Sequence, residues 1–355
     1  MFDVFTKVAD IWEAQLEDIK GAKTSILLEQ YIIENLEDGG IGRRFIDALI
    51  EKQREGVEVR CILDAQGSFE VFRNSILYNH FIHAGGKVFF YKTLGLSNVV
   101  TPIRWLLRDH RKLLLIDRKI SWIGGAVIGE RFREWEDLMV RFTSEDIADV
   151  VNKEFRNQLL RLQEKTSLLA PLTLINANYH ISGNAPGIGN RFCYEEISHA
   201  IMLASESVTL VTPYFAPPLK LKRVLQRRLN DGLSVTLLVP RHSDHLIADL
   251  ARESYMKKML NAGLSLRYAP NMIHAKIVIV DGTWMSFGST NLDALSLLFN
   301  HELNMVTRDT DLIGAVQEVV DRWTKDLPAI TTRTCEYNNQ SFFARFFGRY
   351  CRYVA

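Results

Sequence analysis

The 355-residue chain lacks the sequence features of several protein classes. It contains no run of roughly 20 apolar residues, which a membrane-spanning helix needs, and residues 1–13 carry acidic side chains in place of the apolar stretch of a signal peptide. Its cysteines, Cys61, Cys193, Cys335 and Cys351, are too far apart for a disulfide scaffold or a metal-site spacing. We therefore expect a protein of the reducing cytoplasm that needs neither a metal nor a cofactor and that contacts a membrane only peripherally.

The chain also lacks an excess of charge of either sign. It has 43 basic residues (Lys and Arg) and 42 acidic residues (Asp and Glu), which gives a formal net charge of +1. Nucleic-acid binding depends on neutralising many phosphates, so a nearly neutral chain has little attraction for such a polyanion. We expect no nucleic-acid partner. The 47% of hydrophobic residues is enough for two domains or one large pseudo-symmetric unit.

A short pattern of chemically active residues occurs twice, with identical intervals. Each copy has His-x-Lys, four apolar residues, Asp and then a pair of small residues: His110, Lys112, Asp117 and Gly124-Gly125 in the first half, and His274, Lys276, Asp281 and Gly288-Ser289 in the second. A single histidine on an apolar strand is more often a hydrogen-bonded core residue than a catalytic one. Two copies with the same spacing indicate a duplicated site.

The residue types in this pattern suit the transfer of a phosphoryl group. Each motif runs into an apolar strand, and residues i and i+2 of a strand project from the same face, so each His and its Lys point together. Two imidazoles facing one phosphorus atom supply a nucleophile and a general acid. The two ammonium groups stabilise the charge of the phosphoryl oxygens, so that no metal has to be invoked.

The two halves repeat one another beyond these motifs. The apolar patterns predict strands and helices in the same order in both halves: 24–28, 41–53, 56–63, 75–84 and 86–91 before the first motif, and 208–212, 219–230, 232–239, 245–262 and 264–268 before the second. Strands that alternate with helices imply parallel α/β units with both faces of the sheet covered. Neither half contains a complete site.

Longer strings of residues resemble a known family. Gly288-Ser-Thr-Asn291-Leu-Asp293 leads to Asn300-His-Glu302-Leu-Asn304, and shorter strings occur at Glu29-Gln-Tyr31, at 64–68 and at Thr212-Pro-Tyr214-Phe. These residues resemble the phospholipase D superfamily, and within it the bacterial cardiolipin synthase branch, over about residues 15–325. The resemblance implies an α/β fold of two pseudo-symmetric lobes. Each lobe is a mixed β-sheet flanked by helices, and the active site lies at the lobe interface.

The expected division of the chain follows from the repeat and from turn-forming residues. We expect the first lobe over 1–165, ending in a helix at 154–165, a linker over 166–190 with several Gly and Pro residues, and the second lobe over 191–332. Residues 333–355 form a tail that mixes aromatic side chains with arginines, as interfacial segments do. The tail at 342–353 and the apolar segment 94–107 are both candidates for membrane contact, and the alternative is that both pack on the protein.

By resemblance, His110 is the nucleophile that forms a phosphohistidine and His274 is the general acid and base. The resemblance also makes Asn291 an amide donor to the phosphoryl oxygens, with Ser289 adding a hydroxyl, and it assigns Glu29, Tyr31 and Tyr214 to substrate binding. The first half departs from the family pattern, because Val127 occupies the position of Asn291. Valine cannot hydrogen-bond a phosphoryl oxygen, so we expect an asymmetric pocket.

Four carboxylates accompany the histidines. Asp137 and Glu302 lie 27 and 28 residues after the histidine of their own half, and a carboxylate on the far ring nitrogen of a histidine fixes its tautomer and stabilises the imidazolium. Asp117 and Asp281 complete the catalytic motifs. They lie at strand ends, and Asp281-Gly282 is typical of a hairpin turn, so a structural role is favoured over a chemical one.

The resemblance implies a cardiolipin synthase-like phosphatidyltransferase at the cytoplasmic face of the cell membrane. It would transfer a phosphatidyl group from one phospholipid to a second one, with phosphatidylglycerol as the expected substrate. A phospholipase D-like hydrolase that uses water as the acceptor is the alternative, and a nuclease of the same superfamily is a third interpretation. The sequence indicates no oligomeric state.

We predict that turnover does not depend on a divalent metal, because Lys112 and Lys276 supply the positive charge. Activity measured after dialysis against a chelator should equal that of the untreated protein. Activity that is lost in chelator and restored by one divalent ion would contradict the expectation.

Overall fold

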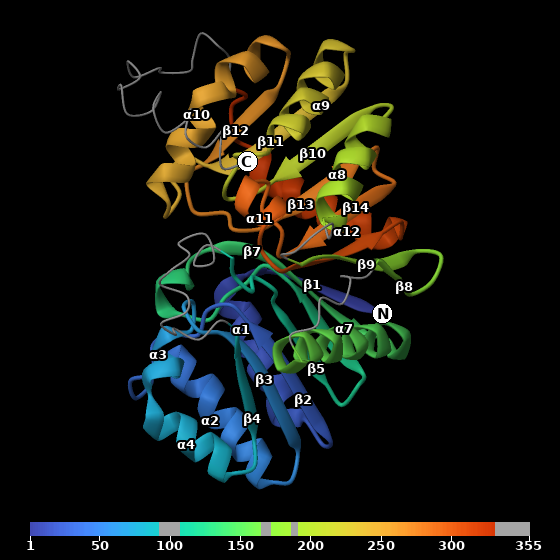
Figure 1. Cartoon of the computed structure of the whole chain (residues 1–355). Helices are drawn as coiled ribbons and strands as arrows, with labels where there is room; N and C mark the ends of the chain where they lie inside the picture. Colours follow the sequence, from blue (N-terminus) through green and yellow to red (C-terminus); the bar gives the residue numbers. More distant parts are fainter. Residues whose placement is uncertain (92–106, 165–171, 186–190, 331–355) are drawn as a thin grey trace.

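The computed structural model of the chain describes residues 1–91, 107–164, 172–185 and 191–330, and the statements below concern these residues. It contains two lobes, each built on one β-sheet, and Figure 1 shows them one above the other. Residues 94–106 and the tail 342–353, for which we expect membrane contact, lie outside the described residues. Among the described helices, none has both the length and the apolar composition needed to cross a bilayer.

The first lobe contains a seven-stranded sheet in the order β1-β7-β6-β5-β2-β3-β4. Its strands are β1 (Phe2–Lys7), β2 (Ser25–Gln30), β3 (Glu58–Asp64), β4 (Lys87–Tyr91), β5 (Leu113–Ile116), β6 (Ile120–Gly124) and β7 (Glu136–Thr143). Its helices are α1 (Val8–Gly21), α2 (Ile41–Arg54), α3 (Phe69–Arg73), α4 (Ser75–His83) and α7 (Glu145–Glu164).

The second lobe contains an eight-stranded sheet in the order β12-β11-β10-β13-β14-β15-β9-β8. Its strands are β8 (Leu172–Leu174), β9 (Tyr179–Asn184), β10 (Ser207–Val211), β11 (Ser234–Pro240), β12 (Ser265–Ala269), β13 (Ile277–Val280), β14 (Trp284–Gly288) and β15 (Glu302–Thr307). Its helices are α8 (Phe192–Leu203), α9 (Leu219–Asn230), α10 (Leu246–Asn261), α11 (Ala294–Leu298) and α12 (Thr310–Thr324).

Apart from the additional edge strand β8 of the second sheet, the two sheets have the same strand order, which confirms the expected pseudo-symmetric α/β fold. In each sheet three parallel strands, β2-β3-β4 or β10-β11-β12, continue into antiparallel strands that begin with β5 or β13. The parallel arrangement expected from the alternation of strands and helices is therefore found for these three strands of each sheet. The remaining strands of each sheet are antiparallel to their neighbours. Short turns join β5 to β6 and β13 to β14, and such turns force a reversal of direction.

The segment between the lobes differs from the expected linker. Over 166–190 the structure contains β8 and β9, and β9 pairs antiparallel with β15 just as β1 pairs with β7. These strands belong to the second sheet because an edge strand with unpaired backbone groups gains a full ladder of hydrogen bonds from them. The helix expected at 154–165 also begins earlier, since α7 begins at Glu145.

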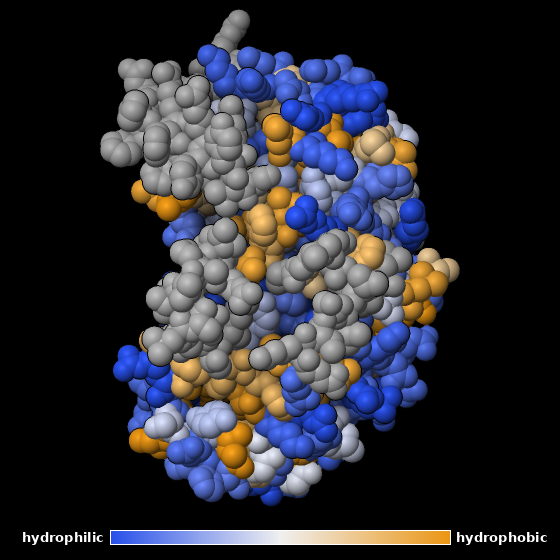
Figure 2. Space-filling model, viewed as in Figure 1, coloured by the Kyte–Doolittle hydropathy of each residue, from blue (hydrophilic) through white to orange (hydrophobic). Residues whose placement is uncertain are grey.

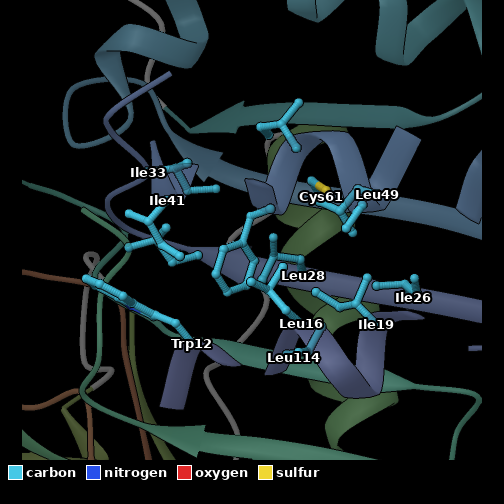
Figure 3. Close-up of a cluster of buried hydrophobic side chains, with 14 of the residues drawn as sticks. Trp12, Leu16, Ile19, Ile26, Leu28, Ile33, Ile41, Leu49, Cys61 and Leu114 are labelled. Atoms are coloured by element: carbon cyan, nitrogen blue, oxygen red, sulfur yellow. The ribbon is translucent and has the colours of Figure 1, made fainter. Parts of the chain in front are cut away.

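The structure contains three hydrophobic cores, one within each lobe and one between the lobes. One core lies between the first sheet and helices α1, α2 and α4, and Figure 3 shows part of it around Trp12 and Leu49. The corresponding core of the second lobe involves α8, α9 and α10. The third core is shared: residues of both sheets, such as Leu115 and Ile279, pack together with α7 and α12. Hydrophobic side chains are also visible near the boundary between the lobes in Figure 2. The shared core means that the lobes do not bury their apolar surfaces independently.

The two motif aspartates hold the turns that follow β5 and β13. Asp117 and Asp281 both have positive φ, of 53° and 51°, a conformation that Asp tolerates better than most residues. The Asp281 carboxylate accepts hydrogen bonds from the backbone N–H groups of residues 205, 206 and 207 at 2.7–2.9 Å. The Asp117 carboxylate accepts equivalent bonds from the N–H groups of residues 23, 24 and 25 at 2.7–3.0 Å. These contacts tie each hairpin to the start of the neighbouring strand and support a structural role.

We predict that Asp281→Ala destabilises the protein by about 1–3 kcal/mol, because three backbone donors lose a charged acceptor. Thermal unfolding should show the lower melting temperature. The activity per folded molecule should remain unchanged. Asp47→Ala, which removes a surface ion pair with Arg43 on α2, is the matched control and should cost well under about 1 kcal/mol. Loss of activity without loss of stability in Asp281→Ala would favour a chemical role.

Candidate active site

The two motif histidines lie at the interface of the lobes, where each is fixed by backbone hydrogen bonds to the other lobe. His110 donates its N–H to the carbonyl of His301 at 2.9 Å, and the N–H of His301 returns a bond to the carbonyl of Arg108. In the same way, the N–H of His274 bonds to the carbonyl of Glu136 at 2.6 Å. The residue just before each motif histidine, Asp109 or Ile273, therefore forms an isolated β-bridge to the other lobe.

The side chain of His110 is oriented by the second lobe. Its Nδ1 lies 3.0 Å from the carbonyl oxygen of Ser289 and 3.1 Å from Oε2 of Glu302. A carbonyl can only accept, so Nδ1 carries the proton and Nε2 of the neutral ring keeps its lone pair. Burial and the ammonium groups of Lys112 and Lys276 hold the pKa of His110 well below its usual value. The neutral imidazole is thus the resting form.

The side chain of His274 is oriented by the first lobe. Its Nδ1 lies 2.7 Å from Oδ2 of Asp137, and Nζ of Lys276 lies 2.8 Å from both ring nitrogens. Burial and Lys276 lower the pKa of His274 to about 4, although Asp137 acts in the opposite direction. A bound anion that offsets the charge of Lys276 would favour the protonated form of this imidazole.

Asp137 and Glu302 do contact the histidines, but each contacts the histidine of the other lobe. The sequence spacing suggested that each carboxylate serves the motif that precedes it. The structure pairs Asp137 with His274 and Glu302 with His110. The reason is that β7 and β15 meet the opposite lobe where they begin, through the bridges of Glu136 to Ile273 and of Asp109 to His301.

The two lysines are buried close to one another. Lys112 and Lys276 are 1% and 3% exposed. Burial and the neighbouring ammonium group of Lys276 lower the pKa of Lys112 to about 7, and burial lowers the pKa of Lys276 to about 8. Two like charges out of water are unfavourable unless an anion lies between them. The arrangement therefore suits the binding of an anionic group such as a phosphodiester.

The two carboxylates differ in charge state. Burial raises the pKa of Asp137, but Lys276 and His274 outweigh burial, so the net pKa is below its usual value. Burial raises the pKa of Glu302 to about 7, and the opposing effects of Lys112 and Ser289 do not overcome it. His274 therefore faces an ionised carboxylate, whereas His110 faces one that is partly protonated near neutral pH.

The small-residue pair that follows each motif is required by close packing. A Cβ atom at Gly124 would lie 2.0 Å from the carbonyl oxygen of Leu138, and one at Gly288 would lie 2.4 Å from that of Leu303. At Gly125 a Cβ would lie 2.4 Å from Oδ1 of Asp137. The glycines thus let the carboxylate-bearing strands pass next to the site.

The structure places most of the residues expected to bind substrate near the histidines. The ring of Tyr31 is 5.0 Å from that of His110 and 5.2 Å from Nζ of Lys112, and the ring of Tyr214 is 6.4 Å from that of His274. Glu29, which we expected to bind substrate, does not lie beside the histidines. It points to the other face of the sheet, is 1% exposed and lies 3.3 Å from Arg111. Strand alternation turns both residues away from His110 and Lys112.

Ser289 and Asn291 have different roles from each other. The hydroxyl of Ser289 donates to Oε2 of Glu302 at 2.6 Å and accepts from the N–H of Leu303, so it orients the carboxylate instead of facing a substrate. The side-chain oxygen of Asn291 is buried and has no hydrogen-bond partner within the described residues. Val127 packs in the apolar core of the first lobe, and its carbonyl accepts a bond from Trp12.

Two residues near the site, a neighbour of His274 and a partner of Tyr214, were missed at the level of the sequence. The ring of Trp135 lies 5.3 Å from that of His274, and the hydroxyl of Tyr214 donates to Asp244 at 2.5 Å. Trp135 directly precedes the strand that carries Asp137, and Asp244 follows the end of β11, so their positions next to strand ends were the available signal. Within the described parts of the chain, no three or more His, Cys, Asp or Glu side chains are grouped to hold a metal ion.

We predict that an anion raises the pKa of His274, because it offsets the charges of the two lysines. Without ligand this histidine is neutral above about pH 4. In the presence of tungstate, a phosphate analogue, nitrogen-15 NMR of labelled histidine should show a pKa higher by about one unit or more. The exposed His83 on α4 is the reference and should not respond. A His274 signal that is unchanged by saturating tungstate would contradict the prediction.

Comparison with known proteins agrees with the geometry. The family described as "Cardiolipin synthase, PLD-like domain" matches residues 16–159 and 197–324. A protein named cardiolipin synthase from Oceanobacillus iheyensis is 30% identical, and the match covers 97% of this chain and 72% of that protein. The major cardiolipin synthase ClsA of Bacillus subtilis is 29% identical, with 92% of this chain and 68% of that protein covered.

Solved structures share the fold. The phosphatidylserine synthase of Haemophilus influenzae has a TM-score of 0.76 at 15% identity, and the match covers 99% of this chain and 93% of that one. A polyphosphate kinase of Porphyromonas gingivalis has a TM-score of 0.65 at 14% identity, covering 99% of this chain and 52% of that one. On the strength of the family match, the chain belongs to the cardiolipin synthase family of phospholipase D-type phosphatidyltransferases.

Proposed function

We propose that the protein synthesises cardiolipin by transferring a phosphatidyl group from one phosphatidylglycerol to the terminal hydroxyl of another, with glycerol leaving. The observation that carries this proposal is the crossed pair of histidine–carboxylate contacts around two buried lysines, in a chain of the cardiolipin synthase family. Such a site can bind one phosphodiester and hold one histidine on each side of the phosphorus.

The first step of the proposed reaction forms a phosphohistidine. Nε2 of His110 attacks the phosphorus, because its lone pair is free when Nδ1–H is bonded to Ser289 and Glu302. The bond to the headgroup oxygen breaks, and the departing glycerol takes a proton from Nε2 of His274. The ionised Asp137 stabilises the imidazolium that donates this proton, which favours His274 over His110 as the acid.

In the second step the phosphatidyl group passes from His110 to the second phosphatidylglycerol. His274, now neutral, removes the proton from the hydroxyl of the second phosphatidylglycerol while that oxygen attacks the phosphorus, and the bond to His110 breaks. Lys112, Lys276 and the amide of Asn291 stabilise the phosphoryl oxygens in both steps. Asp117 and Asp281 act by fixing the hairpins of the two motifs.

The remaining expectations belong to the same proposal. The substrates are phospholipids, and the protein works peripherally on the cytoplasmic face of the cell membrane, with segment 94–107 and the tail 342–353 as the contacts. The chain divides into two lobes, and the second lobe would begin at β8, which pairs with β9 in the second sheet. A hydrolase that uses water differs only in the acceptor, so the same site serves it. Nuclease activity is disfavoured by the net charge of +1.

We predict that purified protein, incubated with mixed micelles of phosphatidylglycerol, produces cardiolipin and glycerol in equal amounts, as measured by lipid mass spectrometry. His110→Ala and His274→Ala should each lower the rate by about 10³-fold or more, because neither histidine can act as nucleophile and proton donor at once.

The products distinguish the alternatives. Phosphatidic acid as the main product would establish a hydrolase, and cleavage of a nucleic acid without lipid products would establish a nuclease. His83→Ala on the exposed face of α4 is the matched control and should retain full activity. Wild-type rates in either motif mutant would contradict the two-histidine mechanism.

A further inference from the structure

A further carboxylate, besides Asp137 and Glu302, lies close to the site in the second lobe. Asp244 follows β11, and its Oδ1 accepts a hydrogen bond of 2.5 Å from the hydroxyl of Tyr214, whose ring faces that of His274. Burial lowers the pKa of Lys276 to about 8, and the charge of Asp244 acts against that shift. The carboxylate is thus within electrostatic range of the phosphoryl-binding lysine.

Asp244 retains hydrogen-bonding capacity. Nε2 of His245 lies 3.8 Å from Oδ2 of Asp244, which is too far for a hydrogen bond, and no lysine or arginine of the described residues forms an ion pair with this carboxylate. Its side chain is 27% exposed and the ring of His245 is 65% exposed. Oδ2 therefore remains open to a ligand that reaches the site.

The first lobe has no such free acceptor at the end of its equivalent strand. Asp64, the last residue of β3, is bonded to the guanidinium of Arg108 and to the N–H groups of Gln66, Gly67 and Asp109. All of its acceptor capacity is used within the protein. Among the described residues, Asp64 therefore does not offer the partly exposed, open carboxylate that Asp244 offers on the His274 side.

A free carboxylate is unfavourable next to a site for an anionic phosphodiester unless it binds another part of the substrate. Asp244 offers an acceptor, the hydroxyl oxygen of Tyr214 offers a second acceptor, and the ring of His245 can donate or accept. An alcohol hydroxyl both donates and accepts, so it matches this set. An ammonium group only donates, so unlike an alcohol it cannot accept a hydrogen bond from the His245 ring.

We propose that Asp244, Tyr214 and His245 form a subsite for the non-reacting hydroxyl of the glycerol headgroup, which selects a polyol as the alcohol that leaves or attacks. This inference rests on the proposed phosphatidyltransfer. When the terminal hydroxyl of the headgroup forms its bond to phosphorus, its proton passes to Nε2 of His274 and the bond from phosphorus to His110 breaks. The neighbouring hydroxyl donates to Oδ2 of Asp244 meanwhile.

The subsite can be tested by competition between two alcohols in one reaction. Phosphatidylglycerol in mixed micelles serves as the donor, with deuterated glycerol and 1-propanol at equal concentrations as acceptors. Mass spectrometry gives the ratio of deuterated phosphatidylglycerol to phosphatidylpropanol. This ratio does not depend on how much of the protein is folded.

We predict that the wild-type protein prefers glycerol and that Asp244→Ala lowers the ratio about tenfold, as expected for the loss of a hydrogen bond to a charged group. Asp244→Asn should recover part of the preference, because an amide oxygen still accepts from a hydroxyl. Tyr214→Phe should lower the ratio less, since Asp244 remains and loses only the hydrogen bond from the Tyr214 hydroxyl. Asp149→Asn, an exposed residue of α7 paired with Arg118, is the matched control and should not change the ratio.

Three outcomes would overturn the inference or its basis. An unchanged ratio in Asp244→Ala would show that the carboxylate does not select the alcohol. If ethanolamine is added as a third acceptor and its use falls in both Asp244 variants while that of glycerol does not, the subsite binds an ammonium group. If the wild-type protein transfers to neither alcohol and makes no cardiolipin, the proposed function itself fails.

Discussion

The structure depends on a reciprocal exchange between its two lobes. Each motif histidine is bonded through its backbone to the strand of the other lobe and through its imidazole to a carboxylate of the other lobe. Neither lobe alone can therefore fix the tautomer of its own histidine. The shared hydrophobic core between the sheets holds these contacts in register, and the catalytic geometry is a property of the docked pair.

The site keeps positive charge in a place where water is largely absent. Two buried lysines that lie near each other destabilise the folded protein, and Asp137 and Glu302 offset only part of this effect. Burial is the main cause of the low pKa values of Lys112, Lys276 and His274, and the charge of Lys276 lowers those of Lys112 and His274 further. In the proposed reaction a phosphodiester would relieve this repulsion, so substrate binding would also favour protonation of His274.

The two half-sites have the same topology but different chemistry. On the side of His274 lie an ionised Asp137 and the open carboxylate of Asp244. On the side of His110 lie a partly protonated Glu302 and the hydroxyl of Ser289, which occupies the position that Gly125 has in the first lobe. The proposed roles, in which His110 would attack the phosphorus and His274 would exchange a proton with the alcohol, rest on these differences.

The sequence by itself determined the elements and the motif residues. Helices such as 219–230 and the strands before each motif were predicted within a residue or two, because apolar periodicity is a local property. It also established that His and Lys share a face, since that follows from strand alternation alone. Only the tertiary structure decided the interaction partners. It pairs each histidine with the carboxylate of the other lobe, and it places Glu29 next to Arg111. It also directs the hydroxyl of Ser289 to Glu302 and adds β8 and β9 to the second sheet. These pairings are set by how two sheets dock and by which edge strands remain unpaired, and no interval along the chain records either.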